Sequence, residues 1–450
     1  MIDPPLHDGG IPLPRRYIAI LAVTAATAAT VVDGAVVTVA LPTVARALGI
    51  AEAQSVMVVT LYQFLLALGL IPMAALGDRF GLRRVFRMGL VIFLAGTLLC
   101  WFVDSIGLLL TLRALQALGA GLLLSVGSAQ IRSVYPLRIL GRGLAFNSLT
   151  VSICMALSPV IGTAILANAE WPIVFVAAAP LALIALAASF ALPEGAALAS
   201  RFDWRSALLY FAAMALLFAA LDGNLLGSFW GRGVSLIGAA YAGWLLVRRA
   251  RREQRPLFPV DLLVRPLLAL SICGALCAFA SSMAVLVILP FRLDQFHHFT
   301  IAETGAALAA WPLATMVVAP AIGLLSDRLQ PWALGAGGLA VTVLALTSLC
   351  FAADTDGPLD IAWRLALCGA GYAAYTASNA RLILANSPRD RAAPVGGLIA
   401  TTRILGQSIG AMITAWTLKL GWVAAPMGLA VPISLAIVGM MFSAGRRRAA

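Results

Sequence analysis

The chain has 450 residues, of which 62% are hydrophobic and 11% are charged, and its mean hydropathy is +0.97. Soluble domains usually carry about 25% charged residues, so the composition excludes an ordinary soluble protein. Its long unbroken apolar runs exclude a membrane β-barrel, and we predict an all-α integral membrane protein. A net charge of +12 often indicates nucleic-acid binding, but the arginines lie in short segments between apolar runs, where the positive-inside rule explains them. We therefore expect no nucleic-acid partner.

Apolar runs long enough to cross a bilayer recur along the whole chain. An even number of spans places both termini on one side. That side is predicted to be the cytoplasm, because only Arg46, Arg232, Arg292 and Lys419 then fall in outer segments. The runs form about fourteen spans, at residues 17–41, 54–76, 85–103, 106–131, 143–168, 171–192, 206–222, 232–247, 266–290, 303–325, 332–352, 361–385, 393–417 and 421–443.

The first span, residues 17–41, contains a single charged residue, Asp33. A carboxylate inside the bilayer costs at least about 2.5 kcal/mol on insertion scales, so a buried intramembrane acid indicates a functional site. The alternative is an aspartate that only holds helices together through hydrogen bonds.

The loop after the second span reads GDRFGLRR, residues 77–84. Gly81 permits a tight turn, Asp78 can face the positive end of the next helix, and the arginines can meet carbonyl ends of helices in the other half. This loop resembles the cytoplasmic loop motif of the major facilitator superfamily, although Ala74 and Leu82 depart from it. The resemblance implies a latch between two halves, formed by Gly77, Asp78, Arg79, Gly81, Arg83 and Arg84, with Asp327 and Arg328 as the counterpart in the second half.

A faint internal repeat supports that fold. GDRFG (77–81) recurs as SDRLQ (326–330), and RALQALGAG (113–121) as RLALCGAG (364–371). Parallel halves of this kind occur in secondary transporters, with the substrate site between them near the midplane. We predict the major facilitator fold: a six-helix bundle at 1–192, an inserted helix pair with cytoplasmic linkers at 193–265, and a second six-helix bundle at 266–450.

Further stretches resemble the fourteen-span drug:proton antiporter branch of the superfamily. They are DGAVVTVALPTVARALG (33–49), VVTLYQFLLALG (58–69), and the inserted pair followed by RPLFPVDLL. MALSPVIGTA (155–164) only partly matches the antiporter motif of the fifth span, because Ser158 and Thr163 replace glycines. Pro159 and Gly162 still allow a bend and a close helix approach, and ordinary helix packing is the alternative.

Arg113 matches the arginine of the family's fourth span. At 1.5 Å per residue, Asp33 and Arg113 lie at similar depths, roughly 10–12 Å below the outer surface, so we predict that they pair. The alternative is that Arg113 caps a backbone carbonyl. Other polar or aromatic residues are candidates for the substrate cavity or for plain helix packing: Tyr62, Gln63, Gln116, Asn147, Trp311, Tyr372, Tyr375 and Asn379.

The resemblance implies a proton-coupled multidrug or lipophilic-cation exporter of a bacterial-type inner membrane that works by alternating access. Asp33 is the only acid deep in either bundle and is the predicted proton carrier, with Arg113 tuning it. The expected partners are a small-molecule substrate, protons and the lipid bilayer. The alternative is an exporter of one metabolite or organic anion, with Arg113 and Arg403 as counter-ions. We expect no catalysis, no cofactor and no metal site, because the six cysteines lie in apolar runs without a matching histidine.

Overall fold

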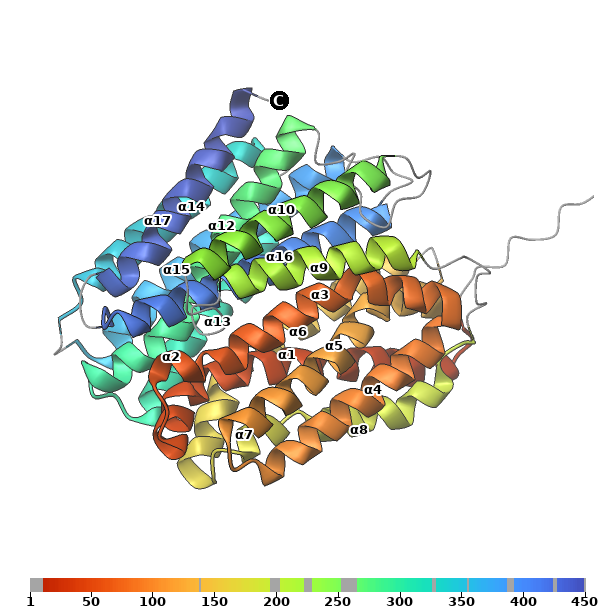
Figure 1. Ribbon diagram of the computed structural model, residues 1–450, viewed down its shortest axis with the longest axis horizontal. Coiled ribbons are helices and arrows are strands. Elements are labelled where there is room, and N and C mark those ends of the chain that lie inside the picture. The colour runs from red at the N-terminus through yellow and green to blue at the C-terminus, as the bar shows by residue number, and fades with distance from the viewer. Residues whose placement is uncertain are drawn as a thin grey trace, which may run out of the picture.

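The computed structural model describes residues 11–136, 139–194, 203–221, 229–251, 265–325, 329–353, 356–386, 392–423 and 427–448, and the regular secondary structure in these ranges is helical (Figure 1). The predicted all-α class is therefore confirmed. Ten stretches of the described helices are long and apolar enough to cross a membrane, one of them being residues 173–191 with α7 and α8 taken together, and α9 adds a shorter apolar helix. The count of fourteen spans stays a prediction.

The helices form two bundles and an added pair. The N-terminal bundle contains α1 (Arg15–Leu48), α2 (Glu52–Ser55), α3 (Met57–Phe80), α4 (Leu82–Leu99), α5 (Ile106–Val134), α6 (Leu140–Asn168), α7 (Ile173–Val176) and α8 (Ala179–Ala188). The added pair is α9 (Trp204–Leu221) and α10 (Phe229–Ala250). The C-terminal bundle contains α12 (Pro266–Gln295), α13 (Ile301–Leu325), α14 (Pro331–Cys350), α15 (Pro358–Ala385), α16 (Ala392–Lys419) and α17 (Met427–Gly445). Most of the two linkers that delimit the predicted domains, residues 195–202 and 252–264, lies outside the described residues.

The sixth predicted span, 171–192, is divided into α7 and α8 rather than forming one helix. Pro180 lies in the first turn of α8. Its nitrogen carries no hydrogen and cannot donate to the carbonyl of Val176, four residues earlier, which is where α7 ends.

The two most extensive contacts between the bundles are those of α6 with α13 and of α3 with α16. Small residues allow the close approach of α6 to its neighbours. A Cβ on Gly162 would lie 2.6 Å from Cγ2 of Val39 on α1, and a Cβ on Gly305 would overlap the Thr163 side chain. Because these two glycines carry no side chain, α6 can approach both α1 and α13 closely.

We call the side where α1 begins and α17 ends the terminus side, and the other the opposite side. On the opposite side, Val36, Leu41 and Val44 of α1 share one apolar cluster with Phe291 of α12 and Leu418 of α16. Apolar side chains from both bundles therefore close the molecule on that side.

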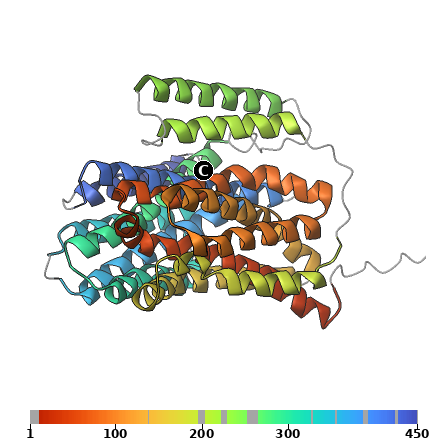
Figure 2. The same ribbon diagram turned by 60° about the horizontal axis from the view of Figure 1, so that its bottom comes forward.

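The inserted pair lies as a separate layer over one face of the two bundles (Figure 2). The Tyr210 hydroxyl on α9 donates to the Ala67 carbonyl of α3 at 2.9 Å, and the Phe64 and Phe218 rings stack with centroids 4.0 Å apart. Met412 of α16 belongs to the same apolar cluster as those two rings. α9 thus contacts both helices, α3 and α16, that meet between the bundles.

Candidate functional site

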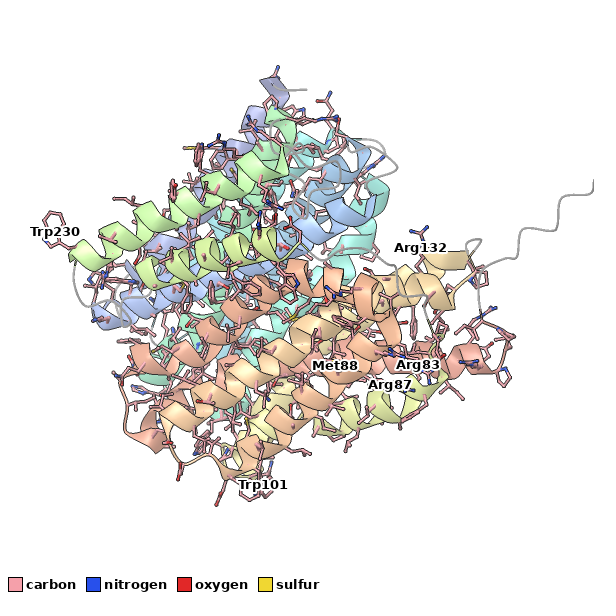
Figure 3. The ribbon with its side chains drawn as sticks, turned by 45° about the vertical axis from the view of Figure 1, so that its right-hand side comes forward. Arg83, Arg87, Met88, Trp101, Arg132 and Trp230 are labelled. Carbon is pink, nitrogen blue, oxygen red and sulfur yellow. The ribbon has the colours of Figure 1, made fainter. Side chains whose placement is uncertain are left out.

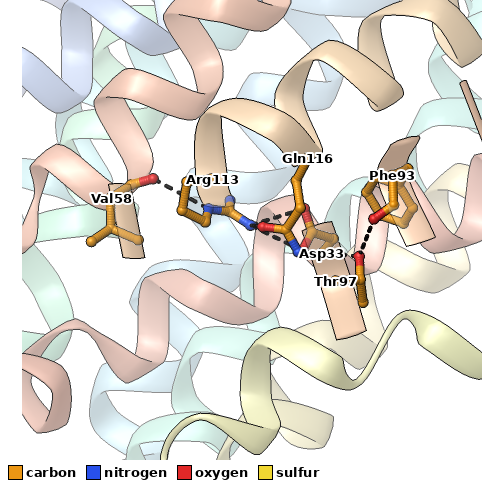
Figure 4. A network of polar contacts seen from close by, with 6 residues as sticks. All are labelled: Asp33, Val58, Phe93, Thr97, Arg113 and Gln116. Carbon is orange, nitrogen blue, oxygen red and sulfur yellow. Dashed lines mark hydrogen bonds and ion pairs between the residues drawn. The ribbon is translucent and has the colours of Figure 1, made fainter. Parts of the chain in front are cut away.

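Asp33 and Arg113 form a buried ion pair inside the N-terminal bundle (Figure 4). Nη1 of Arg113 lies 2.9 Å from Oδ1 and 3.0 Å from Oδ2 of Asp33, and both side chains are 0% exposed. The predicted pairing is confirmed. The capping alternative is present as well, because Nε of Arg113 donates to the Val58 carbonyl at 3.4 Å.

Gln116 extends this pair into a network that links α1, α4 and α5. Its Oε1 accepts from Nη1 of Arg113 at 2.9 Å, and its Nε2 donates to Oδ1 of Asp33 at 3.3 Å. The same Nε2 donates to the Thr97 hydroxyl at 3.1 Å, which donates to the Phe93 carbonyl at 2.7 Å. The carboxylate therefore keeps polar contacts although no solvent reaches it, as a buried charge requires.

Two aromatic rings enclose the Arg113 guanidinium. Its central carbon lies 4.0 Å from the ring centre of Tyr62 and 5.7 Å from that of Phe175. A desolvated cation–π contact contributes about 2 kcal/mol, so Arg113 retains favourable contacts even when Asp33 is neutral. When Asp33 is protonated, Arg113 therefore keeps its contacts with Gln116, Val58 and the Tyr62 ring but loses its counter-charge.

The C-terminal bundle holds a cluster of rings, Phe279, Trp311 and Tyr372, which we call the aromatic cluster. The Tyr372 ring centroid lies 6.0 Å from that of Phe279 and 5.8 Å from that of Trp311. Arg403, a half-buried residue near the middle of α16, interacts electrostatically with Tyr372. A basic side chain therefore lies within electrostatic range of the aromatic cluster.

A small pocket lies between α12, α15 and α16, and Phe279, Tyr375, Asn379 and Thr402 line part of it. Asn379 is 5% exposed, and its Oδ1 has no hydrogen-bond partner among the residues that the structure describes. We call this the C-terminal pocket. Tyr375 and Asn379 meet there, whereas Tyr372 lies in the adjoining aromatic cluster.

The other predicted cavity residues lie apart from this pocket. Oδ1 of Asn147 accepts from the Thr27 hydroxyl at 3.1 Å, and Asn147 lines a second pocket between α1, α5 and α6. Gln63 is 8% exposed. The predicted cavity residues other than Gln63 are therefore distributed over the Asp33 network, the aromatic cluster and two pockets.

The loop motif has the turn that its glycine predicts. Gly81 has a φ of +89°, which L side chains rarely adopt, and Gly77 packs against Val126 of α5. Nη1 of Arg83 lies 2.8 Å from Glu194, and Nη2 donates to the Phe190 carbonyl at 3.3 Å.

Arg83 and Arg87 lie along α4 beside the end of α8 (Figure 3). The Arg83 partners belong to the N-terminal bundle, not to the other half as predicted. Arg79 and Arg84 are exposed, the Asp78 side chain lies outside the described part of the structure, and so do Asp327 and Arg328.

In the α6 motif, residues 155–164, the helix approaches its neighbours closely although Ser158 and Thr163 replace glycines of the family motif. The sequence alone did not show how this is possible. The Ser158 hydroxyl donates to the Cys154 carbonyl at 2.6 Å, and the Thr163 hydroxyl donates to the Pro159 carbonyl at 2.9 Å. Thr163, which replaces a family glycine, packs against Gly305 of α13. The missing glycine is thus present on the partner helix.

Two polar contacts join the bundles on the opposite side, and the sequence did not identify either. Nη1 of Arg46 lies 3.4 Å from Asp294, and the Gln295 amide donates to the Glu52 carboxylate. The sequence shows only that charged residues gather at the ends of loops, and this distribution does not identify which residues pair. Among the residues that the structure describes, no cluster of His, Cys, Asp and Glu could hold a metal ion.

Comparison with known proteins gives consistent results. A family model described as Major Facilitator Superfamily matches residues 23–411 and 272–450. The chain is 40% identical over 424 residues to the uncharacterized transporter YebQ of Escherichia coli K12, covering 92% of each chain. It is 26% identical to the multidrug resistance protein Stp of Mycobacterium tuberculosis, covering 85% of this chain and 73% of that protein. The solved structure of a bacterial homologue of the human lysosomal transporter Spinster, inward-facing and unoccupied, superposes with a TM-score of 0.70 at 17% identity, covering 98% of both chains.

Proposed function

This chain belongs to the major facilitator superfamily, and on that premise we propose that it is a proton-coupled secondary active exporter that works by alternating access. It is a multi-pass protein of the bacterial inner membrane. The observation that carries the proposal is the buried Asp33–Arg113 pair, because an ionisable pair inside the membrane marks an ion pathway.

The pair gives protonation a structural consequence. In the ionised form, Asp33 holds Nη1 of Arg113 through both carboxylate oxygens. A proton on Asp33 removes that attraction and leaves Arg113 with Gln116, Val58 and the Tyr62 ring. Since Asp33 is on α1 and Arg113 on α5, protonation weakens one link between these helices and favours a different packing of the bundle.

We further propose that the terminus side is cytoplasmic and that the loop motif of 77–84 latches that side when the substrate path opens outward. The orientation follows from the distribution of arginines. Arg251→Cys in a cysteine-free background should resist a membrane-impermeant maleimide in intact cells and react after lysis. Strong labelling in intact cells would reverse the orientation.

Two substrate classes fit the sequence, lipophilic cations and organic anions. The name of the relative Stp supports the export of drugs. However, Asp33 already pairs with Arg113, so it offers no free negative charge to a cation in this conformation. Arg403 beside the aromatic cluster favours the second class, anions.

Asp33→Asn tests the proposal, because it keeps the shape of the side chain and removes its titration. In proteoliposomes with an imposed pH gradient, we expect uphill transport to fall to background while substrate exchange without a gradient persists. Asp104→Asn, at an exposed acid before α5, is the matched control and should transport normally. Gradient-driven transport by Asp33→Asn at the wild-type rate would refute the assignment.

A further inference from the structure

The membrane-embedded centre of the molecule has an unbalanced positive charge. Asp33 is neutralised by Arg113 within the N-terminal bundle. Arg364, another arginine of the C-terminal bundle, pairs with Asp356 at 2.6 Å. Arg403 has no acid partner among the residues that the structure describes, and no other acid occurs deep in a span. Charges inside a membrane usually pair, so an unpaired arginine there implies a ligand of opposite charge.

Arg403 lies where the two bundles meet. The next residue, Ile404, belongs to the apolar core cluster of the N-terminal bundle, and the preceding residue, Thr402, lines the C-terminal pocket. One turn later, Gly406 packs against Phe279 of α12, where a Cβ would lie 2.7 Å from the Phe279 Cβ. Arg403 therefore belongs to the part of α16 between the C-terminal pocket and the facing bundle, and transporters of this architecture bind substrate between their halves.

The side chains near Arg403 indicate which other groups the ligand carries. The rings of the aromatic cluster pack on one another with centroids 5.8 and 6.0 Å apart, and the half-buried Tyr372 ring leaves an aromatic surface for a planar ring of a ligand. Asn379 provides a buried polar group whose Oδ1 has no partner within the described part of the chain. A planar guanidinium binds a carboxylate through two parallel hydrogen bonds.

We propose that the substrate is an aromatic organic anion, with its carboxylate on Arg403, its ring against Phe279, Trp311 and Tyr372, and a hydrogen-bonding substituent at Asn379. This inference rests on the proposed export function and specifies its substrate class. It also agrees with the energetics of the inner membrane. A membrane potential that is negative inside expels anions, by a concentration ratio of about fiftyfold per 100 mV, and retains cations.

Three probes with one ring system and different charges test the charge preference: 1-naphthoate, 1-naphthamide and (1-naphthylmethyl)trimethylammonium. Binding to the purified full-length protein is measured by thermal stabilisation and by equilibrium dialysis. The wild type should bind naphthoate at least about tenfold more tightly than the amide, because a charge-assisted hydrogen bond is lost with the amide. The ammonium should bind more weakly still.

Variants assign that preference to Arg403. Arg403→Gln should weaken naphthoate binding about tenfold to a hundredfold and leave amide binding little changed. Arg403→Lys keeps the charge and should retain part of the preference, so it remains informative if Arg403→Gln does not fold. Arg132→Gln removes an exposed arginine at the end of α5 and should behave as wild type. The proposal is wrong if the wild type prefers the ammonium, if none of the probes binds, or if both Arg403 variants retain the full preference.

Transport with the same probes separates this proposal from the export proposal. Export of the ammonium driven by a pH gradient and dependent on Asp33 would support export and refute the anion class. Naphthoate binding that depends on Arg403, together with gradient-driven transport by Asp33→Asn at the wild-type rate, would support the anion class and refute proton coupling through Asp33.

Discussion

The Asp33–Arg113 pair predicts a large energetic coupling that a double-mutant cycle can measure. At 2.9 Å and an effective dielectric constant of about 20, the Coulomb attraction is at most about 6 kcal/mol. Removing one partner of a buried pair typically costs about 3–5 kcal/mol, because the other charge stays buried without compensation. Asp33→Asn leaves Arg113 with Gln116, Val58 and the Tyr62 ring, so it should fall at the lower end of that range.

Arg113→Gln leaves an unpaired carboxylate on Asp33, whose remaining contact with a nitrogen donor is Nε2 of Gln116 at 3.3 Å. We expect the double variant Asp33→Asn/Arg113→Gln to be less destabilised than the sum of the single variants by about 3 kcal/mol, because two neutral amides can bond to each other. Equilibrium unfolding in mixed micelles, at constant detergent composition, measures the three differences. Additive effects, within about 0.5 kcal/mol, would mean that the pair contributes no coupling and would refute the electrostatic argument.

Three further predictions follow from individual contacts. Gly305→Ala should cost about 1–3 kcal/mol, because the new methyl group overlaps Thr163, and the double variant Gly305→Ala/Thr163→Gly should recover most of the loss in thermal stability. Burial acts to raise the pKa of Asp203, but hydrogen bonds from Ser206 and Arg249 outweigh it and hold the pKa below the usual value. The contact of Asp203 with α10 therefore stabilises the inserted pair above the ordinary pKa of 3.8 and is lost as the pH falls through the lowered value. The protection of α9 amides, expressed relative to their intrinsic exchange rate at each pH, should fall with pH in the wild type and not in Asp203→Asn. Asp78→Asn should slow transport at normal protein levels if the 77–84 loop is a latch, and an unchanged transport rate would contradict the latch.

Sequence reasoning recovered those features that depend on one residue or on periodicity. Apolar runs predicted the helices, and Gly81 predicted the turn between α3 and α4 that its φ of +89° provides. Depth along two helices predicted that Asp33 meets Arg113, because an apolar environment leaves an intramembrane charge few other partners.

Contacts between distant segments that involve no intramembrane charge were not recoverable in this way. The contact of Thr163 with Gly305 requires knowing that α6 lies against α13, which no local pattern specifies. The partners of Arg83 were predicted in the other half, whereas Arg83 contacts Phe190 and Glu194, because positive charge near a helix end suits any exposed carbonyl. The sixth span was predicted as one helix because the residues around Pro180 are apolar, although a proline can interrupt a helix.

The positions of Asp33 and Arg403 in different bundles constrain how a proton gradient can drive an anion outward. A cationic substrate would compete with the proton for Asp33, and that competition alone would couple the two. An anion on Arg403 cannot compete in this way, because its negative charge favours a proton on Asp33 rather than displacing it. Exchange then requires that the bundles change their packing with either the proton or the anion bound, and not with both or neither. Such a change must break two contacts between the bundles. One is the contact of α6 with Gly305 of α13, and the other is the contact of α16 with α3. Proton uptake by the detergent-solubilised protein on binding naphthoate would show that the direct electrostatic effect dominates, and the anion and proton would then move together rather than in exchange.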